Sequence, residues 1–353
     1  MTDTRVTPRP GGRQPGTAPL RDASDDVLTV SDLRVHYETR GGVVKAVDDI
    51  SFTLKPGERL GLVGESGSGK TTMALSLMRL IKPPGRIVSG KVDLAGIDML
   101  SLSEDRMRRV RLAEIAMVAQ GAMNSLNPVM KVRDQIIDGW KDHAERMSRS
   151  AIDDRIGELM RQVGLDKDVV GMYPHELSGG MKQRVVIAIA ISLRPKVIIA
   201  DEPTSALDVV VQRRIMETLG RVQEEIGAAV ILIGHDMGLM AQFVDRLGVM
   251  YAGRLAEVSP VEEIFDDPMH PYSRLLIRSL PSLDKKGEFR AIPGLPPSLL
   301  ELPSGCPFHP RCPHVMARCR TETPELIQWR LNRWAACHLF DDEHAAPERS
   351  RTA

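Results

Sequence analysis

The sequence predicts an α/β protein with a parallel-sheet core, a helical insertion and a proline-rich C-terminal extension. Apolar runs at residues 60–63, 197–200 and 229–233 alternate with helical periodicity, which is the pattern of a parallel sheet covered by helices. Between the first two runs, residues 124–170 read mainly as helix. After residue 271 prolines accumulate and periodicity is lost, so this part is expected to bury little core by itself.

The composition restricts the classes of function. The 353 residues contain 47 Lys and Arg against 47 Asp and Glu, a balance that argues against bulk nucleic-acid binding. No apolar run approaches the length of about 18 residues that indicates a transmembrane helix, and the first residues lack the apolar segment of a signal peptide. We expect residues 1–26, rich in Pro, Gly, Thr and Arg, to be disordered and the chain to be cytoplasmic.

The residues ahead of the first core strand alternate in the manner of a sheet. Residues 28–37 are apolar at mostly every second position, and Gly41-Gly42 and Pro56-Gly57 mark turns. The expected strands of this region lie at 28–37, 43–47, 50–54 and 60–63. The expected helices outside the insertion lie at 72–80, 185–193 and 215–226.

A glycine-rich loop joins the strand at 60–63 to the helix at 72–80. It reads Gly-x4-Gly-Lys-Thr, in which the glycines let backbone N–H groups point at anionic oxygens beside the helix N-terminus. Lys70 is expected to reach the β and γ phosphates of a nucleotide, and the Thr71 hydroxyl to bind Mg²⁺. The alternative is a glycine-rich turn that matches by chance. The expected nucleotide-binding residues here are Gly64, Glu65, Ser66, Gly67, Ser68, Gly69, Lys70, Thr71 and Thr72.

Two adjacent carboxylates follow the apolar run 197–200. Asp201 is badly placed at the end of a buried strand unless it meets a cation, so we expect it to bind Mg²⁺ directly or through water. Glu202 then lies where it can orient or deprotonate an attacking water. The alternative is a pair of N-caps opening a helix, which the separate phosphate loop disfavours.

Two longer motifs resemble the nucleotide-binding subunit of ABC transporters. They are Leu177-Ser178-Gly179-Gly180-Met181-Lys182-Gln183-Arg184 and Asp201-Glu202-Pro203-Thr204-Ser205-Ala206-Leu207-Asp208. The resemblance covers roughly residues 28–265. It implies a P-loop ABC-type ATPase core with an antiparallel β subdomain, in a nucleotide-binding domain at 27–265 whose helical insertion spans about 121–178.

The same resemblance implies roles for residues that no local pattern singles out. Tyr37 resembles the aromatic that stacks on adenine, although a packed strand residue would look the same. Gln120 resembles the glutamine that binds Mg²⁺ and senses the γ-phosphate, and His235 the histidine that holds γ-phosphate and water. The implied catalytic residues are therefore Gln120, Glu202 and His235. Ser178, Gly179 and Gly180 would face ATP held by a second ATPase subunit, so that ATP bridges two subunits.

The C-terminal part resembles the tail of ATPase subunits from peptide and nickel importers. The resemblance rests on His270-Pro271-Tyr272, Pro293-Gly294-Leu295-Pro296-Pro297 and Gly305-Cys306-Pro307-Phe308. We assign residues 266–340 to this extension and expect residues 341–353 to be a second disordered tail.

All four cysteines lie in this extension, at Cys306, Cys312, Cys319 and Cys337. Their spacing is not the short C-x2-C of many zinc sites, whereas four thiolates can hold a [4Fe–4S] cluster. Some importers that the tail resembles carry such a cluster. An iron–sulfur cluster with a structural role is the preferred interpretation, with zinc, or free thiols or disulfides, as the alternatives.

Together the resemblances imply an ATP-hydrolysing subunit of an importer for di- and oligopeptides, peripheral at the cytoplasmic face of the cell membrane. The implied cofactors are ATP, Mg²⁺ and the cluster. The implied partners are a second ATPase subunit that is a paralogue, two transmembrane permease subunits and an extracytoplasmic substrate-binding protein, with no nucleic acid. Alternatives are an importer of nickel or another small solute, a soluble ABC ATPase outside transport, and a regulatory subunit that binds nucleotide without hydrolysing it. Glu202 and His235 argue against the last.

Overall fold

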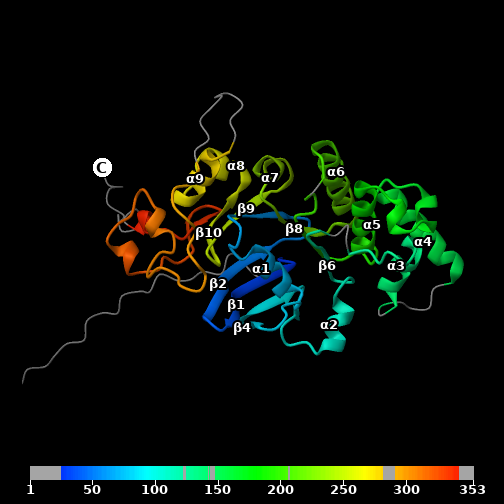
Figure 1. The fold of residues 1–353 in the computed structure, drawn as a ribbon, viewed down its shortest axis with the longest axis horizontal. Helices are drawn as coiled ribbons and strands as arrows, with labels where there is room; N and C mark the ends of the chain where they lie inside the picture. Colours follow the sequence, from blue (N-terminus) through cyan, green and yellow to red (C-terminus); the bar gives the residue numbers. More distant parts are fainter. Residues whose placement is uncertain are drawn as a thin grey trace, which may run out of the picture.

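The computed structural model describes residues 25–121, 125–141, 143, 148–205, 207–280 and 291–341. Figure 1 shows the helices and strands in chain order. Two tails, 1–26 and 341–353, are expected to be disordered. Apart from residues 25, 26 and 341, they lie outside the described residues.

The N-terminal strands form an antiparallel sheet in the order β2-β1-β4-β5. Its strands are β1 (Leu28–Thr39), β2 (Gly42–Leu54), β4 (Gly85–Leu94) and β5 (Ile97–Asp98). The expected strands at 43–47 and 50–54 are one continuous strand, β2, whose pairing with β1 changes register between them. Gly42 makes the turn between β1 and β2 possible with a φ of 133°, a conformation that favours glycine.

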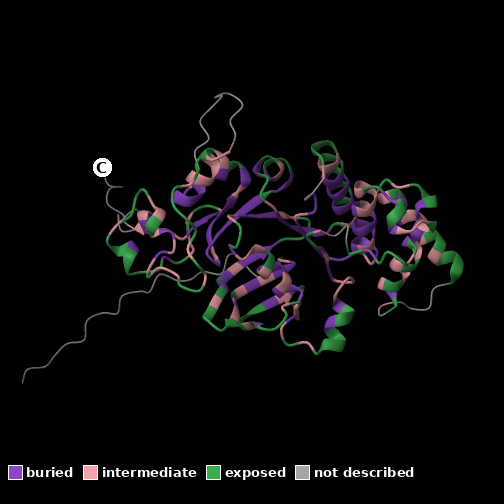
Figure 2. Ribbon diagram, in the orientation of Figure 1, coloured by how far each residue is buried: buried purple, intermediate pink, exposed green. Residues whose placement is uncertain are grey.

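The core is an eight-stranded sheet in the order β11-β12-β10-β9-β3-β8-β7-β6. Its parallel strands are β3 (Arg59–Val63), β6 (Ile115–Val118), β7 (Val197–Asp201), β8 (Ala229–Ile233) and β9 (Arg246–Tyr251). Along β7, Ile198 and Ala200 join one hydrophobic cluster while Val197 and Ile199 join another. The sheet is therefore buried on both faces, as the uninterrupted apolar runs predict; Figure 2 shows these strands as a buried centre with exposed residues on the surrounding helices.

The helices α1 (Lys70–Leu77), α6 (Val209–Ile226) and α7 (Met237–Phe243) follow the strands β3, β7 and β8, and α5 (Gly179–Ile191) precedes β7. Two of them begin six residues before their expected start. Ser178 caps α5 by accepting the Met181 N–H, and Asp208 caps α6 by accepting the N–H groups of Val210 and Val211. Glycines open α5 and valines open α6, and neither residue type favours helix, so the caps define the starts.

The segment in which a helical insertion is expected, about 121–178, has α3 (Val132–Trp140), α4 (Arg149–Gln162) and the short 3₁₀ turns η2 (Lys167–Gly171) and η3 (Pro174–Glu176) among its described residues, and its bounds stay a prediction. Its apolar face packs against α5, with Ile136 and Leu159 fully buried. In Figure 1 these helices stand with α5 at the end of the molecule opposite the C-terminal extension. The helix α2 (Glu104–Val110), capped by Ser103, was not expected from the sequence.

The C-terminal extension is built onto the core sheet. After β10 (Arg254–Pro260), α8 (Val261–Asp266) and α9 (Pro271–Arg278) come the 3₁₀ turns η4 (His309–Arg311), η5 (Arg318–Arg320) and η6 (His338–Phe340), and the strands β11 (Ile327–Arg330) and β12 (Arg333–Ala335). Strand β12 pairs antiparallel with β10. Glu257 in β10, 0% exposed, accepts the N–H groups of Met269 and His270 at 2.9 and 2.8 Å. The extension therefore folds on the core, and sequence periodicity predicted neither of its strands.

Candidate nucleotide site

The phosphate loop runs from β3 to α1, and its shape requires glycine at two positions. Gly64 has a φ of 148°, and a Cβ there would lie 2.2 Å from the Met250 carbonyl oxygen. Gly69 has a φ of 102°, and its Cβ would lie 2.1 Å from the Ala46 carbonyl oxygen. Since real Cβ atoms do not approach that closely, a side chain at either position would force the loop apart.

Lys70 occupies the middle of this loop. Its Nζ donates to the carbonyl oxygens of Gly64 and Glu65 at 2.9 and 3.0 Å, and to Ser68 Oγ at 3.3 Å. Burial lowers the pKa of Lys70, while the carboxylates of Glu202, Asp201 and Glu65 act in the opposite direction. The ammonium group therefore lies where phosphate oxygens can replace its carbonyl partners.

Asp201 ends β7 beside the loop and is only 1% exposed. Neither of its carboxylate oxygens has a hydrogen-bond partner among the described residues. Burial raises the pKa of Asp201, whereas the nearby Thr71 hydroxyl lowers it, Glu202 raises it further and Lys70 lowers it. A buried carboxylate without a partner, next to a hydroxyl, is a donor set that suits Mg²⁺.

The three residues implied in catalysis meet at the carboxyl ends of neighbouring parallel strands. Glu202 follows β7, and its Oε2 accepts a hydrogen bond from Gln120 Nε2 at 2.8 Å. Its Oε1 lies 3.5 Å from Nδ1 of His235, which follows β8. Glu202 adopts a φ of 46°, and its N–H donates to the Ile233 carbonyl oxygen at 2.9 Å. The strained backbone thus aims one carboxylate between an amide and an imidazole.

The structure does not bring the remaining expected residues into contact with this group. Tyr37 lies in β1 and packs against Gly85, where a Cβ would come within 2.5 Å of its ring. Ser178 is exposed at the start of α5, and its Oγ accepts the Met181 N–H at 3.4 Å. Their roles toward nucleotide stay predictions.

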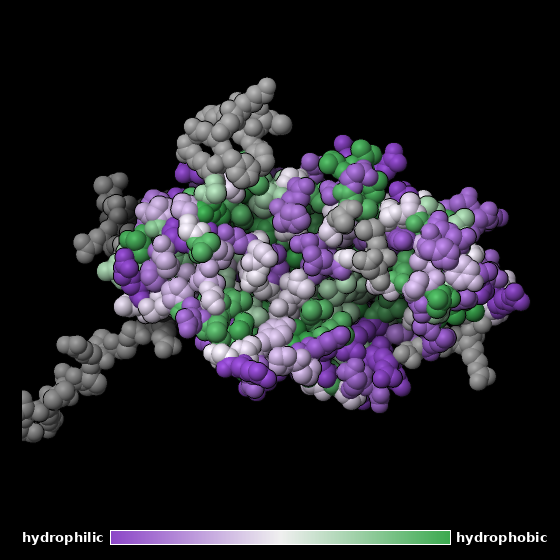
Figure 3. Space-filling view, in the orientation of Figure 1, coloured by the Kyte–Doolittle hydropathy of each residue, from purple (hydrophilic) through white to green (hydrophobic). Residues whose placement is uncertain are grey.

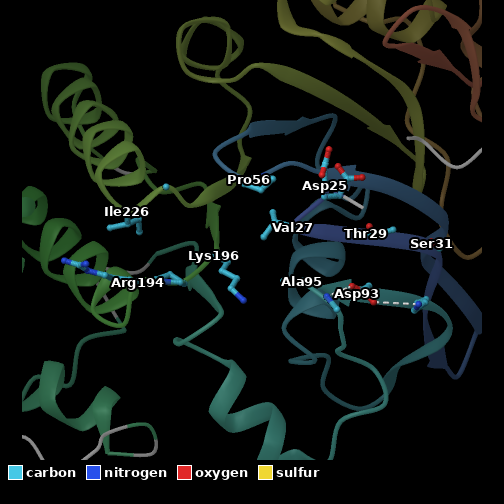
Figure 4. Close-up of a pocket in the computed structure, with 15 residues that line it drawn as sticks. Asp25, Val27, Thr29, Ser31, Pro56, Asp93, Ala95, Arg194, Lys196 and Ile226 are labelled. Carbon is cyan, nitrogen blue, oxygen red and sulfur yellow. Dashed lines mark hydrogen bonds and ion pairs between the residues drawn. The ribbon is translucent and has the colours of Figure 1, made fainter. Parts of the chain in front are cut away.

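A pocket of about 760 Å³ lies elsewhere, between the antiparallel sheet and the start of β7, as Figure 4 shows. Its lining combines the carboxylates of Asp25, Asp26 and Asp93 with the cations of Arg194 and Lys196. It includes no residue of the phosphate loop. The candidate nucleotide site is therefore identified by the buried charged groups around Lys70 and not by the size of this pocket.

The four cysteines line one small pocket in the extension, and none of them is in a disulfide. Burial, and then the proximity of the other thiols, raises the pKa of Cys306 to about 11 and that of Cys337 to about 12. Among the described residues, however, no three His, Cys, Asp or Glu side chains are arranged to hold a metal ion. The thiols are thus gathered but not in coordination geometry.

Four histidines line this pocket together with the thiols: His270, His309, His314 and His338. The ring nitrogens of His338 contact Asp341 Oδ2 at 2.8 Å and the Glu322 carbonyl oxygen at 3.0 Å. His309 Nδ1 lies 3.0 Å from the Cys306 carbonyl oxygen. Four thiols are the donor set that iron–sulfur clusters use, whereas a mixed set of thiols and imidazole suits zinc.

Two residues of the extension touch the phosphate loop: Arg311, which the sequence analysis did not single out, and Tyr272, which it named only as part of a family motif. Tyr272 accepts the Glu65 N–H, and Arg311 forms an ion pair with the Glu65 carboxylate. Both belong to the extension, more than 200 positions after the loop. No local pattern signals a contact across that separation.

Comparisons with known proteins identify the family of this chain. Residues 47–205 match the family described as ABC transporter, and residues 256–319 match the oligopeptide/dipeptide transporter C-terminal region. The oligopeptide transport ATP-binding protein OppD of Escherichia coli (strain K12) is 44% identical over 91% of this chain and 96% of its own length. The dipeptide transport ATP-binding protein DppD of Caldanaerobacter subterraneus subsp. tengcongensis is 42% identical over 90% and 98%.

Solved structures give the same fold. The dimeric structure of MJ0796, titled a bacterial ABC transporter cassette, matches with a TM-score of 0.59 and 28% identity, covering 66% of this chain and 98% of that one. The cassette cbiO1 of Clostridium perfringens matches with a TM-score of 0.60 and 26% identity, covering 69% and 92%. The expected ABC-type ATPase fold is confirmed. The chain belongs to the ATP-hydrolysing ATP-binding proteins of ABC transporters, in the oligopeptide/dipeptide branch.

Proposed function

We propose that this chain hydrolyses ATP to drive an importer of di- and oligopeptides. The observation that supports this most strongly is the meeting of Gln120, Glu202 and His235 beside Lys70 and Asp201. Relatives with 42–44% identity over nine-tenths of the chain are named as oligopeptide and dipeptide transport proteins. An importer of nickel or another small solute is the alternative cargo class for the same extension.

In this proposal the residues divide the work on Mg²⁺·ATP. The loop N–H groups and Lys70 hold the phosphates, while Thr71, Asp201 and Gln120 hold the metal ion. When bound, Mg²⁺ neutralises charge that develops on the phosphates. Glu202 orients and deprotonates the attacking water, and His235 holds the γ-phosphate. The 2.8 Å hydrogen bond from Gln120 fixes the Glu202 carboxylate in place for that role.

A second ATPase subunit completes the site. Ser178, which is exposed, caps α5, and Gly179 and Gly180 begin this helix. In this proposal the three residues contact nucleotide held by another protomer. Val209 and Val210, at the start of α6, are 79% and 62% exposed, and Figure 3 shows hydrophobic side chains at the surface in the region of α6. Exposed valines at this position suit an interface. Two related cassette structures are titled dimeric.

The other partners follow from the relatives' transport role. They are two transmembrane permease subunits and an extracytoplasmic binding protein, with a paralogue as the second ATPase. Among the described residues, no helix combines the length and apolarity needed to cross a membrane. The chain is then a peripheral subunit on the cytoplasmic face, and peptide passes through the permeases.

A [4Fe–4S] cluster at Cys306, Cys312, Cys319 and Cys337 is part of the proposal. Four free thiols around one pocket support it, and burial raises the pKa of Cys306 and of Cys337, so these two would need a bound cation to be thiolates. Coordination requires the thiols to move together. Zinc remains the competing metal. Metal analysis of anaerobically purified protein decides between iron, zinc and neither.

The test of the proposed function is hydrolysis by the complex of this chain with its permeases. The Glu202→Gln variant keeps the shape of the side chain but removes the base, so it should bind Mg²⁺·ATP and release phosphate at least about 100-fold more slowly. Wild-type turnover in this variant would refute the catalytic assignment. Hydrolysis without any association with permeases would instead favour a soluble ABC ATPase.

A further inference from the structure

Two residues of the C-terminal extension form hydrogen bonds with one residue of the phosphate loop, Glu65. The Tyr272 hydroxyl, from α9, accepts the backbone N–H of Glu65 at 2.9 Å. Arg311, from η4, donates from Nη1 and Nη2 to the two Glu65 carboxylate oxygens at 2.6 and 2.9 Å. The backbone and the side chain of Glu65 are therefore both held from the extension, and the ion pair has the bidentate geometry that fixes orientation.

Arg311 is locked in place by further partners. Its Nε donates to the Pro293 carbonyl oxygen at 2.9 Å, its Nη1 also to the Tyr251 hydroxyl at 3.2 Å, and its Nη2 also to the Ile292 carbonyl oxygen at 3.5 Å. With the two bonds to Glu65, all five N–H groups of the guanidinium have acceptors. Its side chain is only 4% exposed. Such an arginine holds its partner in one geometry.

The surroundings of this pair are rigid as well. The rings of Tyr251 and Tyr272 lie 4.6 Å apart between centroids, and that of Phe308 lies 5.2 and 5.4 Å from them. Phe308 is 1% exposed. Aromatic rings at these distances attract one another and pack densely, so Tyr272 and Arg311 rest on a fixed support.

Glu65 links this support to the phosphate-binding lysine. The carbonyl oxygen of Glu65 accepts two hydrogen bonds: one from Lys70 Nζ at 3.0 Å, and one from the Ser68 N–H at 3.2 Å, which closes a turn. Gly64 and Gly69 on either side have positive φ angles and leave the loop with little conformational preference of its own. The contacts at Glu65 therefore reduce the conformational entropy of the loop before nucleotide binds, so that less entropy is lost on binding.

Arg311 also has an electrostatic consequence. Glu65 places a carboxylate next to a loop that must receive phosphate groups, and like charges repel strongly in partly buried sites. The guanidinium neutralises that carboxylate at 2.6 Å. Without Arg311, the loop would be both freer and more negative, and both changes weaken anion binding.

We propose that Arg311, assisted by Tyr272, is a positioning residue that holds the phosphate loop ready for nucleotide, so that ATP affinity depends on the folded C-terminal extension. This rests on the proposed function, because it presumes that the loop binds ATP. Arg311 acts through Glu65 and does not itself touch the nucleotide.

The test measures Mg²⁺·ADP affinity of the full chain by calorimetry, together with KM and kcat for ATP in the complex with permeases. For Arg311→Met we expect the dissociation constant to rise about tenfold, the size of coupling that packed networks carry, with KM rising more than kcat falls. Arg311→Lys should be intermediate, because an ammonium cannot make the bidentate pair. Arg330→Met is the matched control, because Arg330 also lies in the extension and forms an exposed ion pair with Asp267 at 3.2 Å. The affinity of this variant for Mg²⁺·ADP should equal that of wild type.

Two further variants keep the test decisive if Arg311→Met unfolds. The double variant Arg311→Met with Glu65→Gln leaves no unpaired charge. Its affinity for Mg²⁺·ADP should lie between those of wild type and of Arg311→Met alone. Tyr272→Phe keeps the buried ring, and it should speed amide hydrogen exchange in peptides covering residues 64–69, because Glu65 loses its acceptor.

The outcomes separate this inference from the proposed function. Folded Arg311→Met with wild-type affinity, or Tyr272→Phe with unchanged exchange in the loop, overturns the positioning role. Wild-type protein that binds no Mg²⁺·nucleotide at all overturns the proposed function instead.

Discussion

Replacing Asp201 by Asn should stabilise the nucleotide-free protein and remove its response to Mg²⁺. Asp201 is 1% exposed, and neither carboxylate oxygen makes a hydrogen bond of full geometry among the described residues; the nearby Thr71 hydroxyl offsets only part of the cost of burial, which still raises the pKa of Asp201. An unpaired buried polar group costs about 1–3 kcal/mol, and a charged one more. Asparagine has the same shape without the charge, but its amide N–H groups also need acceptors. We therefore expect Asp201→Asn to gain about 1 kcal/mol net, or roughly 2–4 °C in Tm for a large domain.

The pH dependence of this effect has a definite sign. Burial raises the pKa of Asp201 in the folded protein, so the folded state binds this proton more tightly than the unfolded chain. The resulting stabilisation is complete below the unfolded pKa of about 3.9 and is lost as pH rises through the folded pKa. The advantage of Asp201→Asn over wild type should therefore grow from acid toward neutral pH.

Thermal unfolding in EDTA across this pH range, and then with Mg²⁺·ADP, measures both effects. Ligands that bind only the folded state raise Tm, and the Mg²⁺-dependent part of that rise should vanish in Asp201→Asn. Asp154→Asn on the exposed side of α4 is the matched control and should change neither quantity. A variant less stable than wild type in EDTA at pH 7, or one with the full Mg²⁺-dependent rise, would refute the reasoning.

Three further predictions follow from other contacts. Lys70→Ala should weaken nucleotide binding at least about tenfold, because the charged donor inside the phosphate loop is lost; unchanged affinity by calorimetry would contradict this. Glu257→Ala should lower the free energy of unfolding by about 2–4 kcal/mol, since the buried N–H groups of Met269 and His270 lose their acceptor, and an unshifted urea midpoint would exclude that anchor. Cys312→Ser should reduce the iron content of anaerobically purified protein, and equal iron in variant and wild type would remove Cys312 from the proposed ligands.

Local sequence patterns singled out several of the residues that the structure brings together at the candidate site. The phosphate loop needs glycines and a lysine at fixed spacing, and Asp201 and Glu202 stand at the end of an apolar strand. Parallel strands bring their carboxyl ends to one edge of the sheet, which is why residues as distant as Gln120, Glu202 and His235 meet there. The roles of Gln120 and His235 were predicted from the family resemblance alone, because no local sequence pattern around either residue indicates a catalytic role.

Features that depend on distant contacts were not predicted. The interruption of β2 in the sequence pattern arises at Asp48, a buried acid that accepts from Arg254 Nη2 at 2.7 Å across 206 positions. The strands β11 and β12 are short, and β12 exists because β10 offers it an edge. The hold of Arg311 on Glu65 likewise spans 246 positions. Periodicity reports local burial only, so such partners are invisible to it.

The central claim is that ATP is held between two protomers, with the exposed start of α5 completing a site on the partner ATPase. The most direct measurement is a high-resolution structure of the assembled transporter carrying Glu202→Gln and loaded with Mg²⁺·ATP. We expect Ser178 Oγ within hydrogen-bonding distance, about 2.5–3.2 Å, of the γ-phosphate bound by the partner. Ser178 facing solvent, with every nucleotide enclosed by a single chain, would contradict it.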